Sequence, residues 1–203
     1  MTLSDILKLH AILHNKRQLV FALIIIFIYY VIMALDITAV KGIIESNTFI
    51  ITDSQITIII DAGAKTEAVK KALAGRKPEA VFLTHEHHDH VTYAKDYEKE
   101  FGCPVHLIDH ENDIVIKALT IKPILCPGHS AKSVVYLIHD YLFTGDVLFD
   151  DCIGRTDFMK NGEELMQQSL KKLLDVKFTI AYHGHGDPSS YEDQIKNIKS
   201  FIY

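Results

Sequence analysis

Four histidines fall within six residues of this chain, in the segment THEHHDH at 84–90. The segment directly follows the run AVFLT, which is short, continuous and apolar, as is typical of a buried parallel strand. His85 and His87 are two residues apart, so in an extended loop both imidazoles point the same way and can share one metal ion. Asp89 and His90 project differently and can reach a second ion. The cluster therefore predicts a metal site at the end of a buried strand.

The residue types in this cluster indicate which metals it would hold. A zincin helix needs the pattern HExxH, and this is excluded because position 89 is an aspartate. Imidazole nitrogens and carboxylate oxygens suit Zn²⁺, although iron and manganese accept the same ligands. The three cysteines are too few and too scattered for a disulfide framework or a CxxC zinc site. We therefore expect two Zn²⁺ ions, with iron or manganese as possible replacements.

Three later segments show the same pattern, in which a histidine or aspartate lies just beyond a predicted strand. PGHS at 127–130 contains His129, TGD at 144–146 contains Asp146, and HGHG at 183–186 contains His183 and His185. Each has a glycine alongside, which permits a tight turn. Strand ends at one edge of a sheet converge on one cleft, so we expect these side chains to join the histidine cluster.

The remaining pattern predicts an α/β protein in which two sheets pack between helices. Runs rich in β-branched residues alternate with amphipathic segments, and turn residues separate them. We expect strands at 37–44, 48–52, 56–61, 80–84, 104–109, 120–125, 133–138, 141–145 and 177–182, and helices at 65–74, 91–101, 162–174 and 190–202.

The motifs HxHxDH, PGHS, TGD and HGHG, in this order over residues 37–203, resemble those of the metallo-β-lactamase superfamily. The resemblance implies a four-layer αββα sandwich with a binuclear metal site. Carried over by position, it implies that metal one is bound by His85, His87 and His129, and metal two by Asp89, His90 and His185. Asp146 would bridge both ions. Asp61, in the segment IDAG, would support the ligands, and His183 would be a neighbour of the site.

A narrower resemblance lies in GDVLFDDCIGRTDF at 145–158, which looks like the glyoxalase II-like branch. Members of that branch hydrolyse thioesters, and related persulfide dioxygenases use one iron. The resemblance therefore implies a binuclear metal-dependent hydrolase in which a metal-bound hydroxide attacks a small thioester or ester. Asp89 would be the catalytic residue that orients the nucleophile and handles the proton. The alternatives are an iron-dependent persulfide dioxygenase-like enzyme and a non-catalytic, membrane-tethered metal-binding protein.

Charge indicates which partners to expect. The formal net charge of −5 argues against nucleic acid as the main partner, so we expect a small-molecule substrate. The sequence leaves the oligomeric state open.

The front of the chain differs from the rest. Residues 19–35 read LVFALIIIFIYYVIMAL, without a charge, and lie at the lower limit of length for crossing a bilayer. Lys16 and Arg17 precede the run, so the positive-inside rule predicts a membrane anchor with a cytoplasmic N-terminus. We expect an N-terminal segment at 1–35 and a metal hydrolase domain at 36–203. A chain that began at Met33 would instead be a soluble cytoplasmic domain.

Overall fold

The computed structural model describes residues 20, 24 and 35–202 of the chain. Within them, no helix combines the length and the apolar character needed to cross a membrane. The predicted anchor at 19–35 and the alternative start at Met33 lie outside the described residues, apart from Val20, Ile24 and Leu35.

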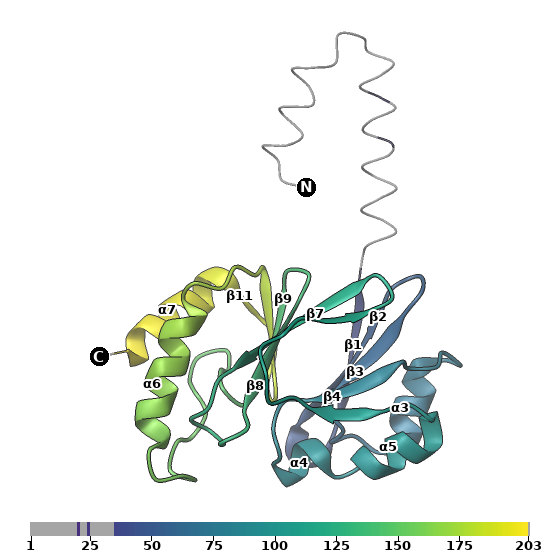
Figure 1. The fold of residues 1–203 in the computed structure, drawn as a ribbon, viewed down its shortest axis with the longest axis horizontal. Helices are drawn as coiled ribbons and strands as arrows, with labels where there is room; N and C mark the ends of the chain where they lie inside the picture. The colour runs from purple at the N-terminus through teal and green to yellow at the C-terminus, as the bar shows by residue number, and fades with distance from the viewer. Residues whose placement is uncertain (1–19, 21–23, 25–34, 203) are drawn as a thin grey trace.

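The first half of the chain forms one sheet with helices α3 and α5 on its outer face and the single-turn helix α4 between them in sequence (Figure 1). Its strands run in the order β1-β2-β3-β4-β5, antiparallel up to β3 and parallel from β3 to β5. They are β1 (Asp36–Lys41), β2 (Asn47–Thr52), β3 (Thr57–Ile60), β4 (Ala80–Leu83) and β5 (Val105–Leu107). The helices are α3 (Thr66–Leu73), α4 (His88–Val91) and α5 (Ala94–Phe101). The strand predicted at 37–44 is too long, because the chain leaves β1 at Lys41 and turns through a 3-10 helix at Ile43–Glu45.

The second half forms the other sheet, in the order β11-β10-β9-β8-β7-β6. Neighbouring strands are antiparallel except β9 and β10, which are parallel. They are β6 (Ile114–Ile116), β7 (Leu119–Leu125), β8 (Val134–Ile138), β9 (Tyr141–Gly145), β10 (Ile180–His183) and β11 (Ser189–Ser190). Helices α6 (Gly162–Leu173) and α7 (Tyr191–Phe201) cover its outer face. The short elements β6, β11 and α4 are not predicted by the sequence pattern.

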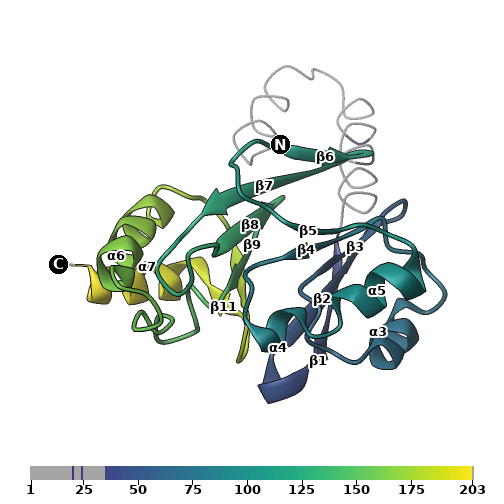
Figure 2. The same ribbon diagram turned by 60° about the horizontal axis from the view of Figure 1, so that its bottom comes forward.

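Three apolar layers hold these elements together, so the predicted αββα arrangement is present (Figure 2). Ile58 and Ile60 of β3 face the second sheet, whereas Ile59 between them faces α3 and α5. This alternation explains why β3 is an unbroken run of isoleucine: both of its faces are covered. On the far side, Leu170 of α6 and Ile198 of α7 pack on the second sheet.

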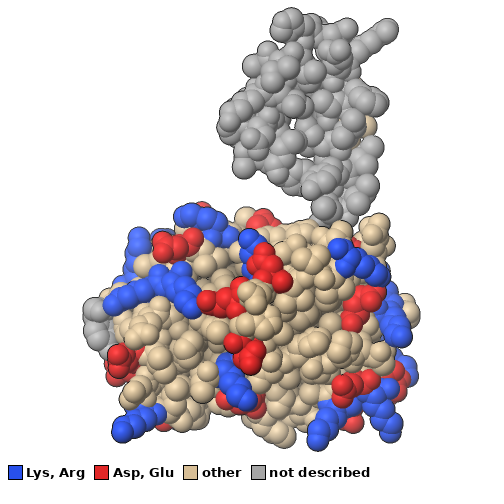
Figure 3. Space-filling view, in the orientation of Figure 1, with Lys and Arg blue, Asp and Glu red and all other residues tan. Residues whose placement is uncertain are grey.

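The surface carries charges of both signs, and they are interspersed on the face shown in Figure 3. Some form exposed ion pairs, such as Lys172 with Glu111 at 2.8 Å. Pairs of this kind contribute roughly 0–1 kcal/mol each, because water screens them. The apolar layers, rather than the ion pairs, therefore stabilise the fold.

The carboxyl ends of β4, β7, β9 and β10 meet at one edge of the molecule, between the two sheets. Two backbone hydrogen bonds join the sheets there. Val134 N–H donates to the Thr84 carbonyl at 2.8 Å, and Asn47 N–H donates to the Gly184 carbonyl at 2.7 Å. All four predicted ligand segments follow these strand ends, so the fold places them at one edge.

Candidate metal centre

The structure brings all seven predicted ligands together. They form three overlapping groups, and within each group one ligand atom per residue lies within 4.8 Å of the others. Group one is His85, His87 and His129; group two is Asp89, His90 and His185; and a third set, His85, His90 and Asp146, joins them. The ligands come from both sheets, as the predicted convergence of strand ends requires.

Group one consists of imidazoles held at the ends of β4 and β7. His129 Nε2 lies 2.8 Å from His87 Nδ1, and the His85 ring lies beside both. His129 Nδ1–H donates to the Arg155 carbonyl at 3.0 Å, which leaves Nε2 as the nitrogen that faces the group. This second hydrogen bond fixes the tautomer and the ring orientation that a metal ligand needs.

Group two combines imidazole and carboxylate. His185 Nε2 lies 3.0 Å from Asp89 Oδ2, and His90 Nε2 lies 3.6 Å from the same oxygen. Asp89 and His90 belong to α4, a single helical turn that follows the extended His87. This turn is the reason why Asp89 and His90 project away from His85 and His87.

Asp146 lies between the two groups. Its Oδ1 is 3.2 Å from His90 Nε2, and its Oδ2 is 3.6 Å from both His129 Nε2 and His185 Nε2. The next loop must pass very close to this carboxylate. A Cβ on Gly184 would lie 2.0 Å from Asp146 Oδ1, so position 184 requires glycine because of contact rather than because of a turn. The turn itself is at Gly186, with a φ of 78°.

Asp61 lies behind the groups and organises two of their members. It has a φ of 65°, a left-handed conformation that aspartate tolerates better than most residues. Its Oδ1 accepts a hydrogen bond from Thr84 N–H at 2.7 Å, and its Oδ2 lies 2.8 Å from His90 Nδ1. Thr84 Oγ1 in turn lies 3.0 Å from His85 Nδ1. Thr84 thus belongs to the site, although sequence reasoning did not single it out.

His183 is buried but stands apart from the three groups. Its Nδ1 lies 2.8 Å from the Leu148 carbonyl oxygen, and its Nε2 lies 2.8 Å from Ser189 Oγ. Burial lowers the pKa of His183 to about 4, so the ring is neutral at pH 7. With both nitrogens occupied, His183 is a neighbour of the site.

The residues fit a metal ion. His85 Nε2, His90 Nε2 and Asp146 Oδ1 are buried without a well-formed hydrogen bond, although the last two atoms lie 3.2 Å apart. Each such atom would otherwise cost about 1–3 kcal/mol, and all three belong to the set that joins the two groups. Imidazole nitrogens and a carboxylate oxygen are ligands for zinc, iron or manganese.

The electrostatics favour a cation at this point. Burial lowers the pKa of His85 to about 2, so its ring is neutral and keeps a free lone pair. Burial alone would also lower the pKa of His90, but Asp61 and Asp146 raise it to about 10. Their carboxylates therefore favour positive charge at His90 Nε2, whether it is carried by a proton or by a metal. A metal that bound there would displace the proton.

An exposed aromatic side chain borders group one. The ring of Phe158, 54% exposed, lies 5.0 Å from the His87 ring and 5.3 Å from the His129 ring, centroid to centroid. The Arg155 guanidinium packs over its other side, 4.7 Å from the ring centroid. Arg155 and Asp157 form an exposed ion pair outside the three groups.

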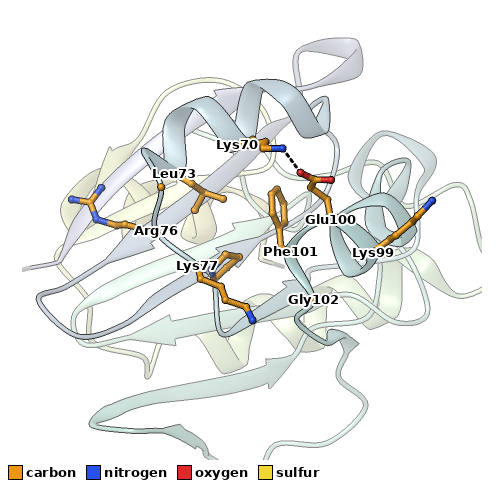
Figure 4. A pocket seen from close by; sticks show the side chains of 10 residues that line it. Lys70, Leu73, Arg76, Lys77, Lys99, Glu100, Phe101 and Gly102 are labelled. Carbon is orange, nitrogen blue, oxygen red and sulfur yellow. Dashed lines mark hydrogen bonds and ion pairs between the residues drawn. The ribbon is translucent and has the colours of Figure 1, made fainter.

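A separate cavity of about 500 Å³ lies at the opposite end of β4, between the ends of α3 and α5 (Figure 4). Lys70, Arg76, Lys77 and Lys99 line it, and Glu100 pairs with Lys70. Cations at the carboxyl ends of helices are favoured by the partial negative charge there. Because the ligands follow β4 and this cavity precedes it, the cavity is not part of the metal centre.

Known proteins resemble this chain in family, in sequence and in structure. The family model of the metallo-beta-lactamase superfamily matches residues 42–116 and 105–185, together more than half of the chain. A probable metallo-hydrolase, YqgX of Bacillus subtilis (strain 168), is 26% identical over 79% of this chain and 95% of its own length. A hydroxyacylglutathione hydrolase of Salmonella paratyphi A is 31% identical over 68% of this chain. The matched region spans only 61% of that hydrolase.

The structural comparison agrees with the family match. The crystal structure of the BLEG-1 B3 metallo-beta-lactamase superposes with a TM-score of 0.74 at 26% identity, over 83% of this chain and all of the other. All members of the three His/Asp groups lie within residues 42–185, which the family model matches. The resemblance drawn from the four sequence motifs is thereby confirmed, and the chain belongs to the metallo-β-lactamase superfamily.

Proposed function

We propose that this protein is a metal-dependent hydrolase that holds two metal ions and cleaves a small thioester or ester. The observation that carries the proposal is the position of Asp146 between two complete ligand groups. The unpartnered buried atoms of His85 and His90 face the same point. A binuclear centre would satisfy all of these atoms at once.

Group one would hold one ion and group two the other, with Asp146 shared. Ions held there would lower the pKa of a water molecule and polarise a carbonyl oxygen, which is the chemistry that hydrolysis of an acyl group needs. Zinc is the first candidate, because the ligands are nitrogen and oxygen and no redox step is required.

The chain's own residues supply the remaining functions. Asp89 carries a carboxylate whose side chain is partly exposed and lies 3.0 Å from His185, so it can orient the attacking water and accept its proton. The exposed ring of Phe158 offers an apolar surface beside group one for the acyl part of a substrate.

No cysteine is placed to act as the nucleophile among the described residues. Cys103 and Cys126 are buried, and burial raises the pKa of both thiols, that of Cys126 to about 12. Cys152 is exposed, and its thiol pKa is also raised by partial burial and by Asp151. None belongs to the three groups, so a water molecule is the nucleophile that the site supports.

The thioester class is supported by the similarity to a hydroxyacylglutathione hydrolase. That relative extends well beyond the region it shares with this chain, so recognition of the thiol part of its substrate is not carried over. We therefore propose that the enzyme cleaves an acyl–sulfur or acyl–oxygen bond. The substrate panel below identifies the thiol or alcohol that is released.

The test combines metal analysis with a substrate panel. The purified protein is analysed for zinc, iron and manganese. It is then assayed on thioesters of glutathione, coenzyme A and simple thiols, and on aryl esters. We expect two metals per chain and hydrolysis of at least one substrate class. One iron per chain with oxygen consumption on a persulfide would favour the dioxygenase alternative. Two metals without any turnover would favour a metal-binding protein.

A further inference from the structure

We infer that Asn47 is a positioning residue that holds His185, and with it the second metal position, in place from the opposite sheet. The inference rests on the binuclear centre proposed above and assigns part of its assembly to a residue that is not a ligand.

Asn47 contacts the backbone on both sides of His185. It is the first residue of β2, is 3% exposed, and its backbone N–H donates to the Gly184 carbonyl at 2.7 Å. Its side-chain Nδ2 donates to the carbonyl of His183 and to that of Gly186, each at 3.0 Å. Three hydrogen bonds from one residue thus clamp the segment that carries the ligand.

The segment needs such a clamp. His185 stands between two glycines, which restrict the backbone less than any other residue. Its imidazole is 25% exposed, lies 3.0 Å from Asp89 and 3.6 Å from Asp146, and stands edge-on to the His90 ring at 5.4 Å between centroids. These neighbours are themselves metal ligands, so their contacts with His185 depend on the metal, whereas the contacts of Asn47 with the loop backbone do not.

The residue before Asn47 holds the other loop of group two. Ser46 is fully buried, and its Oγ donates to the Asp89 carbonyl at 2.8 Å. The packing there is close, since a Cβ on Gly63 would lie 1.9 Å from that carbonyl oxygen. Two consecutive residues at the start of β2 therefore fix both loops of group two relative to each other.

Group one receives no such support from this dipeptide in the described hydrogen bonds. Its two loops are linked instead by Ser130 Oγ, which donates to Glu86 Oε2 at 2.8 Å. The inference is therefore selective: loss of the Asn47 side chain should weaken the second metal position and spare the first.

The experiment measures two metal dissociation constants on the full chain. Metal-free protein is titrated with Zn²⁺ against a chromophoric chelator, and the His87→Ala and His185→Ala variants assign each constant to a group. In Asn47→Ala we expect the group-two constant to weaken by about 10- to 100-fold and the group-one constant to stay unchanged. Activity is not needed as a readout.

The matched control is Asn197→Ala. Asn197 of α7 is also buried, and its Nδ2 also donates to two backbone carbonyls, those of Phe149 at 3.2 Å and Cys152 at 3.1 Å. Its loss should lower the unfolding temperature of the metal-free protein without changing the ratio of the two constants. An equal weakening of both constants in Asn47→Ala, no change in either, or the same selective loss in Asn197→Ala would overturn the inference.

If Asn47→Ala does not fold, Asn47→Leu decides, because it keeps a side chain of similar size and removes the donors to the His183 and Gly186 carbonyls. Selective weakening of group two supports the inference, and unchanged or equally weakened constants overturn it. The proposed function fails differently. A wild-type chain that binds one Zn²⁺ would overturn the binuclear centre itself, whereas two ions in the wild type and two unaltered constants in the variants would overturn only the positioning role.

Discussion

Group one contains imidazoles alone, whereas group two combines two imidazoles with the carboxylate of Asp89. The two loops of group one are linked to each other near the surface, by Ser130 and the exposed Glu86. The two loops of group two are instead fastened from the buried start of β2. Neighbouring halves of one site thus depend on different parts of the fold, and each half can be disturbed alone.

The largest effect is expected when the residue that the two groups share is removed. In Asp146→Ala, both ions lose a ligand and the negative charge that offsets their mutual repulsion. We expect loss of both metals and a fall in turnover of more than about 100-fold, measured by metal content and steady-state kinetics. Asp151→Ala, which removes an exposed carboxylate outside the groups, is the control. Retention of two metals in Asp146→Ala would show that it does not bridge.

The next largest effect should distinguish two adjacent histidines, of which only one is a predicted ligand. His87 lies within group one, 2.8 Å from His129, whereas His88 is exposed and contacts Thr92. His87→Ala should release the group-one metal and lower turnover by about 10- to 100-fold, because that ion keeps only the shared carboxylate of Asp146, whereas group two also has Asp89. His88→Ala should behave as wild type. Equal damage from the two variants would show that the ligand assignment is wrong.

A smaller loss of metal and turnover is expected from a change in group two. His185→Ala should release the group-two metal and leave the group-one metal bound, since Asp89, His90 and Asp146 still balance the local charge. His183→Ala is the matched variant: both of its ring nitrogens have partners away from the groups. It should lower the unfolding temperature while both metals remain. If His183→Ala loses metal as readily as His185→Ala, then the assignment of His185 as the ligand and His183 as a neighbour is wrong.

The smallest effect concerns the rim of group one. Phe158→Ala removes an exposed apolar surface without touching a ligand, so metal content should not change. We expect KM for an acyl substrate to rise by roughly two- to tenfold with little change in kcat, because only part of the ring can be covered. A fall in kcat with unchanged KM would instead place the ring at the reacting atoms.

Sequence patterns predicted much of the fold and the segments that meet at the site, whereas the membership of both groups came from the family resemblance. Ligand residues stand directly after β-branched runs, and those runs have a periodicity that local sequence reveals. The β-branched run at 56–61 predicted a strand, and the structure places β3 there and covers both of its faces. Short pieces were missed, because β6, β11 and α4 are too brief to show a period.

Asn47 and Thr84 could not be found in the same way. The contact of Asn47 with the carbonyl of His183 joins positions 136 residues apart, and it is made to backbone rather than to a side chain. Backbone carbonyls leave no mark on the local sequence, so no motif spacing could indicate such a partner. The role of Gly184 was likewise mistaken for a turn, because only the folded structure shows how close Asp146 comes to it.

The joining of the two sheets at the ligand edge also has a consequence for the order of events during synthesis. The ligands are distributed from residue 85 to residue 185, and a chain leaves the ribosome from its N-terminus. A nascent chain that has emerged only through β5 carries His85, His87, Asp89 and His90 but has neither His129 nor Asp146 to complete a group. Such distant contacts form slowly and only after much of the chain has collapsed. Neither ligand group is therefore complete until strands of the second sheet are in place, so a metal bound at this edge would be taken up late in folding, from the supply that the folded protein meets.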